Sequence, residues 1–224
     1  MDDVSPALQA IDLYRFFHAG DHETLALRGV NVSVETGQVV AVTGPSGSGK
    51  STLLACLAGL DEPDGGMVIA AGHPLSRRPE AERSAMRARH IGILFQHGNL
   101  LETLTVMENV RLAQLLSRQR ASRSASRILD ELGIAHRSQA RPSNLSGGEA
   151  ARAGLAVAIA NDPEIILADE PTGELDSTTA QQVMGVLRER ADRGAAVLIV
   201  THTPEIAAAA DAEIRLVDGK VLAP

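Results

Sequence analysis

One short run in this sequence has the residue types and spacing needed to hold a phosphate chain. Residues 44–51 read Gly-Pro-Ser-Gly-Ser-Gly-Lys-Ser and match the pattern G-x-x-x-x-G-K-[ST]. The glycines let backbone N–H groups turn inward around phosphate oxygens, Lys50 can reach the β and γ phosphates, and the Ser51 hydroxyl can ligate magnesium. An ordinary glycine-rich turn is the alternative, but average residue frequencies give this pattern by chance in roughly one chain in a hundred of this length. The run predicts a site for ATP with Mg²⁺ and hydrolysis of that ATP.

Lysine usage supports the same interpretation. Lys50 and Lys220 are the only lysines, and apart from the histidines every other basic side chain is arginine. The broad planar guanidinium would not fit a site shaped for a compact ammonium, so a sequence that otherwise prefers arginine has a physical reason to keep Lys50.

The phosphate loop lies between a predicted strand and a predicted helix. The apolar run at residues 38–43 predicts a strand that ends at the first glycine. After the loop, Leu53, Leu54 and Leu57 have helical spacing, and Gly59 ends the helix. This strand, loop and helix would place the helix start against the phosphates.

The rest of the chain alternates apolar strands with helices, which predicts an α/β fold with a parallel sheet. We expect a single domain of residues 1–224, with an α/β core at 1–95 and 160–224 and a mostly helical insert at 96–159. The clustered Ser and Arg side chains at 118–127 indicate a solvated helix face. Further strands are expected at 8–13, 30–34, 67–71, 91–95, 164–168 and 195–200, and further helices at 79–90, 105–119, 122–132, 149–160 and 178–192.

Composition argues against nucleic acid as a partner and for a reducing compartment. The formal net charge is −7, aromatic residues make up only 2% and there is no Trp, so basic surface and stacking platforms are scarce. The single cysteine, Cys56, lies in an apolar run and is predicted to be a small buried hydrophobe. Residues 1–4 lack the features of a secretion signal, and no apolar run nears the roughly 20 residues that span a bilayer. A cytoplasmic chain is expected, with any membrane role supplied by a partner.

Three further motifs narrow the class of phosphate-loop protein. Leu145-Ser146-Gly147-Gly148-Glu149 opens a predicted helix, an apolar strand ends in Asp169-Glu170, and His202 follows a second apolar strand, while Gln96 comes directly after Phe95. This set, in this order, resembles the ATP-binding cassette (ABC) family along almost the whole chain. Leu-Ser-Gly-Gly is its most diagnostic element, because other phosphate-loop classes lack it. The resemblance implies a P-loop NTPase (RecA-like) core with a mostly parallel sheet, an N-terminal antiparallel β subdomain and an inserted helical subdomain.

The two acids at the strand end suit magnesium binding and general-base catalysis. Asp169 would be costly as an unpaired anion at the end of a buried strand, and a magnesium ion held through water and Ser51 provides compensating charge. Glu170 is then placed to orient or deprotonate the attacking water, a role typically worth about 10² to 10⁴ in rate. The alternative for Glu170 is a helix-capping acid before Pro171.

The resemblance assigns further roles at the nucleotide. Gln96 would touch the magnesium or the water and signal to a permease, and His202 would contact the γ-phosphate, although a lone histidine is more often structural. Phe17 occupies the position where the family stacks an aromatic on adenine; Tyr14 and Phe16 are nearby alternatives, and a core or surface Phe is the plain one. The nucleotide-binding residues implied are Phe17, Gly44, Pro45, Ser46, Gly47, Ser48, Gly49, Lys50, Ser51, Thr52, Ser146, Gly147, Gly148 and Glu149.

The signature run at residues 145–149 supplies a second anion-binding helix start. One chain needs only one such cradle for ATP. The family solves this by head-to-tail homodimerisation, in which each signature closes over the γ-phosphate held by the partner's phosphate loop. Residues 174–176 resemble the loop that links the two sites.

Several details resemble the lipoprotein-release and macrolide-exporter branch of the family. That branch implies an integral-membrane permease with few membrane helices and a large external domain, export or extraction of lipophilic cargo, and an ATPase held peripherally on the inner face of the cell membrane. The details are Glu149 in place of Gln, Arg87 before Ile91-Gly92, Phe95-Gln96, Glu108-Asn109-Val110 and Pro171-Thr172-Gly173.

The chain also departs from the family pattern. Ala150-Ala151 and Val157 stand where glutamines and an arginine are usual, and Thr203 replaces the usual acid after the histidine. None of these removes a phosphate-loop, magnesium or water-orienting group, so we expect hydrolysis to survive while coupling and dimer contacts change.

Two other functions compete with a transporter ATPase. A soluble ABC ATPase acting on DNA or ribosomes would need long coiled-coil insertions or two cassettes, and the chain has neither. A small-molecule kinase would need an acceptor pocket and an Arg-rich lid, and it would have no use for residues 146–149.

Overall fold

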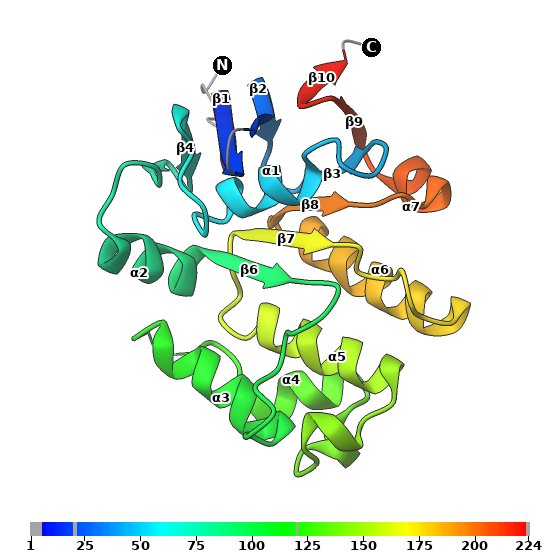
Figure 1. Ribbon diagram of the computed structural model, residues 1–224. Coiled ribbons are helices and arrows are strands. Elements are labelled where there is room, and N and C mark those ends of the chain that lie inside the picture. The colour runs from blue at the N-terminus through cyan, green and yellow to red at the C-terminus, as the bar shows by residue number, and fades with distance from the viewer. Residues whose placement is uncertain (1–5, 20–21, 120, 223–224) are drawn as a thin grey trace.

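The computed structural model describes residues 6–19, 22–119 and 121–222. The structure has two sheets: the smaller one lies at the top of Figure 1 beside one end of the larger sheet, and helices α3 (Val106–Leu116), α4 (Ala125–Glu131) and α5 (Gly147–Ala158) form a helical body below the other end of the larger sheet. Residues 1–4, for which the sequence suggests no secretion signal, lie outside the described residues. Within those residues no helix is both long and apolar enough to cross a bilayer.

The larger sheet has six strands in the order β10-β9-β3-β8-β7-β6. Strands β9, β3, β8, β7 and β6 pair in parallel, as the alternation of strands and helices predicts, and β10 pairs with β9 antiparallel. The central strands are buried on both faces, so they are continuous apolar runs. Their bounds are β3 Val39–Thr43, β6 Ile91–Leu94, β7 Ile165–Asp169, β8 Ala196–Val200, β9 Ala212–Val217 and β10 Lys220–Leu222.

The N-terminal sheet is antiparallel, in the order β2-β1-β4-β5. Strands β1 (Leu8–Ala19) and β2 (His22–Val34) form a hairpin much longer than the expected strands at 8–13 and 30–34. The pairing shifts register at three places, and Asp12 has a φ of 51°, so the apolar alternation that reveals a strand is interrupted. The sheet is completed by β4 (Gly65–Ala70) and β5 (His73–Pro74).

Helix α1 (Lys50–Leu57) packs between the two sheets and buries an apolar face. Its Cys56 is 1% exposed, and desolvation by burial raises the pKa of the thiol to about 12. The prediction that Cys56 is a small buried hydrophobe is therefore confirmed.

The other face of the six-stranded sheet is covered by helices that share one apolar core with it. The expected helices are present, but α7, β9 and β10 were not anticipated by the pattern, because short segments with many Ala or charged residues carry little periodicity. The helices are α2 Glu80–His90, α3 Val106–Leu116, α4 Ala125–Glu131, α5 Gly147–Ala158, α6 Ser177–Asp192 and α7 Pro204–Ala209, with 3₁₀ turns η1 Ala135–Arg137 and η2 Pro142–Asn144.

The expectation of a solvated helix face at residues 118–127 holds for most of the described Ser and Arg side chains, but Arg123 departs from it and only part of the run is helical. Helix α3 ends before this run and α4 begins within it, and the side chain of Arg123 is only 11% exposed. Arg123 pairs with Glu131 at 2.6 Å and with Asp162, and the nearly buried Arg190 of α6 pairs with the same two acids. These ion pairs join the helical body to the core, which a one-dimensional charge pattern cannot show.

Candidate functional site

The phosphate loop joins the end of β3 to the start of α1, as its sequence context predicts. Gly47 and Gly49 have φ values of 77° and 101°, which residues with a side chain rarely adopt. A Cβ on Gly49 would lie 2.5 Å from the Ala26 carbonyl oxygen, and one on Gly44 would lie 2.0 Å from that of Leu216. The glycines thus permit both the turn and the close approach of neighbouring backbone.

The loop is arranged to receive an anion. The helix that follows it has no side-chain cap on its first turn and no acid there, so its N-terminal amides are not taken up by the protein's own side chains. The Lys50 ammonium donates to the carbonyl oxygens of Gly44 and Pro45 at 2.8 and 2.9 Å, which hold it over the loop.

Most of the predicted site residues surround one open cavity of about 750 Å³. Pro45 and Ser48 do not line this cavity, and the buried Ser48 hydroxyl has no hydrogen-bond partner among the described residues. The predicted residues that do line it are Phe17, Gly44, Ser46, Gly47, Gly49, Lys50, Ser51, Thr52, Gln96, Asp169, Glu170 and His202.

Asp169 lies at the end of β7, half-buried beside the phosphate loop. Burial raises the pKa of its carboxyl group, while a hydrogen bond from the Ser51 hydroxyl opposes that rise and the nearby charge of Glu170 adds to it. An anion whose charged form is disfavoured in this way, next to a hydroxyl, is well suited to a divalent cation. Among the described residues, no three His, Cys, Asp or Glu side chains form a group that could hold a metal ion by themselves.

Glu170 and His202 both line the cavity, and their side chains contact each other. His202 Nδ1 lies 2.7 Å from Glu170 Oε1, and the His202 amide donates to the other carboxylate oxygen at 3.4 Å. The backbone of Glu170 has a φ of 47°, an unusual value for a residue with a side chain, and its N–H donates to the Val200 carbonyl at 2.9 Å. Strain held at a carboxylate beside the phosphate loop is the kind found at functional sites.

Gln96 follows β6 and reaches the same cavity from another strand. Its amide nitrogen would lie 3.7 Å from a Cβ placed on Gly173, so the segment after β6 meets the turn after β7. The next residues also meet, because His97 Nε2 lies 2.9 Å from Glu174 Oε2. Movement of either loop would therefore reach the other.

Phe17 also lines the cavity and is 41% exposed. The guanidinium of Arg15 lies 4.7 Å from the centre of its ring and is itself held by Asp61 and Asp64. The aromatic ring is thus fixed on β1 rather than buried in the core.

The signature run, residues 145–149, lies outside the phosphate cavity of its own chain. None of the described residues lining the phosphate cavity comes from residues 145–149. Ser146 begins α5 with a capping box, in which its hydroxyl accepts from the Glu149 amide at 3.3 Å and the Glu149 carboxylate accepts from the Ser146 amide at 2.8 Å. Only Gly147 approaches the neighbouring cleft that Gln96 and Glu170 also line.

Sequence reasoning missed part of the cavity lining. Most of that part comes from β2 and from the turn between β9 and β10, where the Gly219 amide donates to the Ser48 carbonyl at 3.0 Å. An Asp-Gly pair between apolar runs is a hairpin signal that could have revealed this turn. The unanticipated lining residues are Thr24, Leu25, Ala26, Arg28, Val200, Asp218 and Gly219.

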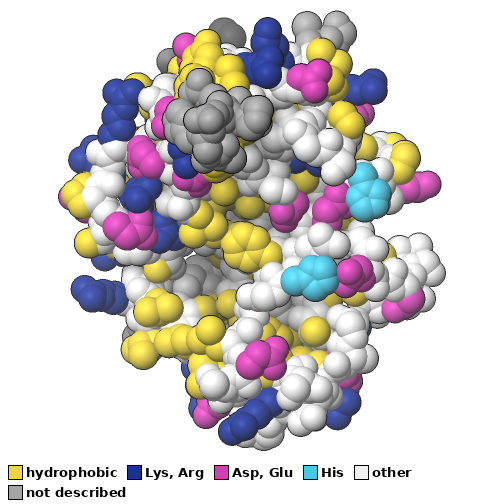
Figure 2. All heavy atoms as spheres, viewed as in Figure 1, with side chains coloured by type: hydrophobic (Ala, Val, Ile, Leu, Met, Phe, Trp, Pro, Cys, Tyr) yellow, Lys and Arg dark blue, Asp and Glu magenta, His cyan; other side chains and the backbone are white. Residues whose placement is uncertain are grey.

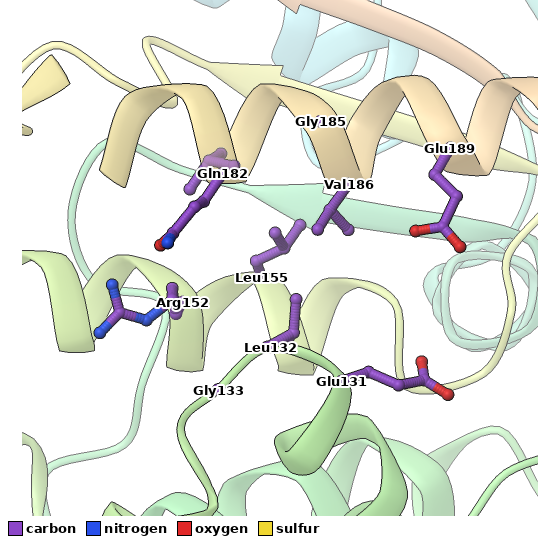
Figure 3. A pocket seen from close by; sticks show the side chains of 10 residues that line it. Glu131, Leu132, Gly133, Arg152, Leu155, Gln182, Gly185, Val186 and Glu189 are labelled. Carbon is purple, nitrogen blue, oxygen red and sulfur yellow. The ribbon is translucent and has the colours of Figure 1, made fainter. Parts of the chain in front are cut away.

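A second cavity, of about 450 Å³, opens between α5 and α6 (Figure 3). Leu132, Leu155 and Val186 lie along its middle, with Gln182 and Arg152 at one end and two glutamates at the other. The glycine turn that lines it, at Gly133, follows the end of α4 and does not begin a helix, so this cavity lacks the helix N-terminus with which the phosphate loop would hold a nucleotide.

Comparisons with known proteins agree with this geometry. The family model described as "ABC transporter" matches residues 27–173. The chain is 38% identical to the macrolide export ATP-binding/permease protein MacB of Shigella flexneri over 98% of its own length, and it spans about a third (34%) of MacB. It is also 38% identical to the ABC transporter ATP-binding protein MJ1508 of Methanocaldococcus jannaschii, covering 96% of this chain and 97% of that one.

Solved structures of the cassette MJ0796 have the same fold. A dimeric post-hydrolysis state bound to ADP and phosphate superposes with a TM-score of 0.89 at 32% identity, covering 96% of this chain and 97% of that one. A second dimeric structure of MJ0796 gives a TM-score of 0.90 at 33% identity with the same coverage. With its phosphate loop and strand-end carboxylates in place, the chain belongs to the ABC transporter family and is an ATPase.

Proposed function

We propose that two copies of this chain close head to tail around two MgATP and drive a separate membrane permease. The observation that carries the proposal is the position of the signature run: a helix start whose Gly147 and Gly148 amides have no intrahelical carbonyl to bind, lying outside the phosphate cavity of its own chain. A second copy supplies the phosphate that such a helix start can bind. The cassette MJ0796, which has the same fold, is dimeric in two solved structures, and this supports the pairing of two copies.

The geometry around the phosphate loop supports the catalytic roles that we propose. Glu170 orients and deprotonates the attacking water, and His202, at 2.7 Å from it, holds the carboxylate and approaches the γ-phosphate. Ser51, Asp169 and Gln96 would hold magnesium, which would supply positive charge to the phosphates of the bound nucleotide. Lys50 and the loop amides hold the triphosphate, and Phe17 stacks on the adenine.

The permease would dock beside α3. A cleft of about 340 Å³ lies between α2, β6, α3 and α5, and Leu115 and Leu116 of α3 are 73% and 61% exposed near its edge. Figure 2 shows hydrophobic side chains gathered over α3. Val157, which stands where the family usually has an arginine, lines this cleft and makes it more apolar. An apolar helix of a permease would bury these side chains.

A short path leads from this cleft to the catalytic site. Asn99 accepts from the Phe95 amide at 2.8 Å and donates to its carbonyl at 2.6 Å, and Asn109 of α3 accepts from the Leu101 amide at 2.8 Å. These bonds fix the segment that carries Gln96 against the first turns of α3. Displacement of α3 would thus move Gln96 at the nucleotide.

Export or extraction of lipophilic cargo is the transport role we propose, with the chain held on the inner face of the membrane by its permease. Its support is the likeness to MacB, whose name joins an ATP-binding and a permease function in one chain. We also propose that residues 1–95 and 160–224 form the catalytic core and that residues 96–159 move as a helical subdomain.

Size-exclusion chromatography of the Glu170→Gln variant, with and without MgATP, tests the proposal. The variant retains nucleotide but turns it over too slowly to reopen, so a dimer is expected only with MgATP. A monomer under both conditions would contradict closure around two nucleotides.

A further inference from the structure

The acid of the signature run, Glu149, is held by an arginine from outside the run. Arg137 Nε lies 2.8 Å from Glu149 Oε1, and a second guanidinium nitrogen lies 3.3 Å from Oε2, the oxygen that also accepts from the Ser146 amide. The Glu149 side chain is only 13% exposed. Both carboxylate oxygens are thus occupied within the chain.

The Glu149 carboxylate carries a negative charge beside the helix start that, in the proposed dimer, would bind the phosphate of the second copy. The hydrogen bond from Arg137, helped by the Ser146 amide, lowers the pKa of Glu149 to about 2, so the group is ionised at neutral pH. An ionised acid in the first turn stabilises the helix but repels a phosphate approaching the same amides. Helix α1, which begins at the phosphate loop, has no acid in its first turn and no such conflict.

Arg137 is presented from a fixed backbone. It ends the 3₁₀ turn η1, and the residues after it accept hydrogen bonds from the first turn of α3: the Met107 amide donates to the Ser138 carbonyl and the Val106 amide to the Ala140 carbonyl, each at 2.9 Å. The guanidinium can therefore hold Glu149 in one place.

We propose that Arg137 is a positioning residue for the signature turn. By pairing with Glu149 it turns the carboxylate away from the Gly147 and Gly148 amides and cancels its charge, so that these amides can bind the terminal phosphate held by a second copy. The inference rests on the proposed head-to-tail closure and adds a residue to it.

The test is MgATP-driven dimerisation in the Glu170→Gln background, measured by sedimentation, together with nucleotide binding to the monomer. Arg137→Gln should weaken dimerisation about tenfold, the scale of a hydrogen bond to a charged group, and leave monomer binding unchanged. Adding Glu149→Gln should restore dimerisation to within about threefold of the parent, because glutamine keeps the capping box and removes the charge. Arg127→Gln, which removes an exposed arginine paired with Glu131, is the matched control and should change nothing.

The outcomes separate the two proposals. If the Glu170→Gln parent dimerises but Arg137→Gln does not weaken the dimer, or Glu149→Gln fails to rescue it, the role of Arg137 is overturned while head-to-tail closure stands. If the parent itself does not dimerise with MgATP, both proposals fail.

Discussion

Helices α1 and α5 both begin at glycine-rich turns, and they differ in whether side chains of the protein cap the backbone amides of the first turn. Helix α1 follows Gly49 with no side-chain cap and no first-turn acid, and Lys50 adds a positive charge. Helix α5 follows Ser146 with a complete capping box, and its Glu149 forms an ion pair with Arg137. The first start lies in a cavity with Asp169, Glu170 and His202, whereas the second lies outside it.

The difference indicates that the two helix starts bind phosphate with different strength. An uncapped helix start with a lysine can hold a triphosphate strongly, but it needs the rest of the loop to fold around it. A capped start is stable without ligand and offers only a few neutral amides, so it binds a phosphate weakly and only where another site already holds it. Variants of each start should therefore affect different steps.

The largest effect is expected from the carboxylate beside the first helix start. Glu170→Gln should lower turnover by about 10² to 10⁴ with little change in nucleotide binding, because an amide cannot accept the proton of the attacking water. Steady-state phosphate release and fluorescent-nucleotide titration measure the two quantities. Glu189→Gln on α6 is the control, and equal loss of turnover in both variants would contradict the assignment.

The next effect concerns the lysine of the first helix start. Lys50→Ala should weaken nucleotide binding to the monomer by roughly 10 to 150-fold, the range of a charge-assisted hydrogen bond. Isothermal titration with MgATP measures it. Lys220, the only other lysine, provides the matched control: Lys220→Ala should bind as wild type, and comparable weakening in both would show that Lys50 has no special role.

A smaller effect is expected at the second helix start. Ser146→Ala removes a cap worth about 1 kcal/mol and should lower turnover about fivefold while monomer binding of ATP stays unchanged. Turnover and binding are measured on the same preparation. Parallel loss of both would place Ser146 at its own chain's nucleotide and remove the contrast between the two helices.

The smallest effect on the isolated ATPase is expected at the proposed docking leucines. Leu115→Glu combined with Leu116→Glu should leave turnover of the free chain within about twofold, because both side chains are exposed, and should abolish co-purification with a co-expressed permease. Retained co-purification would place the permease elsewhere. Leu222→Glu, an exposed leucine on β10, is the control.

Much of the fold and part of the site could be predicted from the sequence, for local reasons. A few adjacent residues determine each of three features: the phosphate loop, strand β7 with its terminal acids, and the capped start of α5. The part of the cavity lining formed by Arg28 and Asp218 depends on β9 joining the sheet beside β3, a pairing of residues far apart in the chain. The ion pair of Arg137 with Glu149 and the burial of Arg123 likewise depend on tertiary packing that no window of sequence reports.

Mixing two inactive variants tests the central claim most directly. Gly147→Asp should fold normally, since a side chain there meets no atom within 4 Å, and its carboxylate should block the signature amides. Neither Gly147→Asp nor Glu170→Gln should hydrolyse ATP alone. If each site combines the phosphate loop of one copy with the signature of the other, a 1:1 mixture forms dimers with one intact site and regains up to about a quarter of wild-type turnover. A mixture no more active than the separate variants would contradict the account.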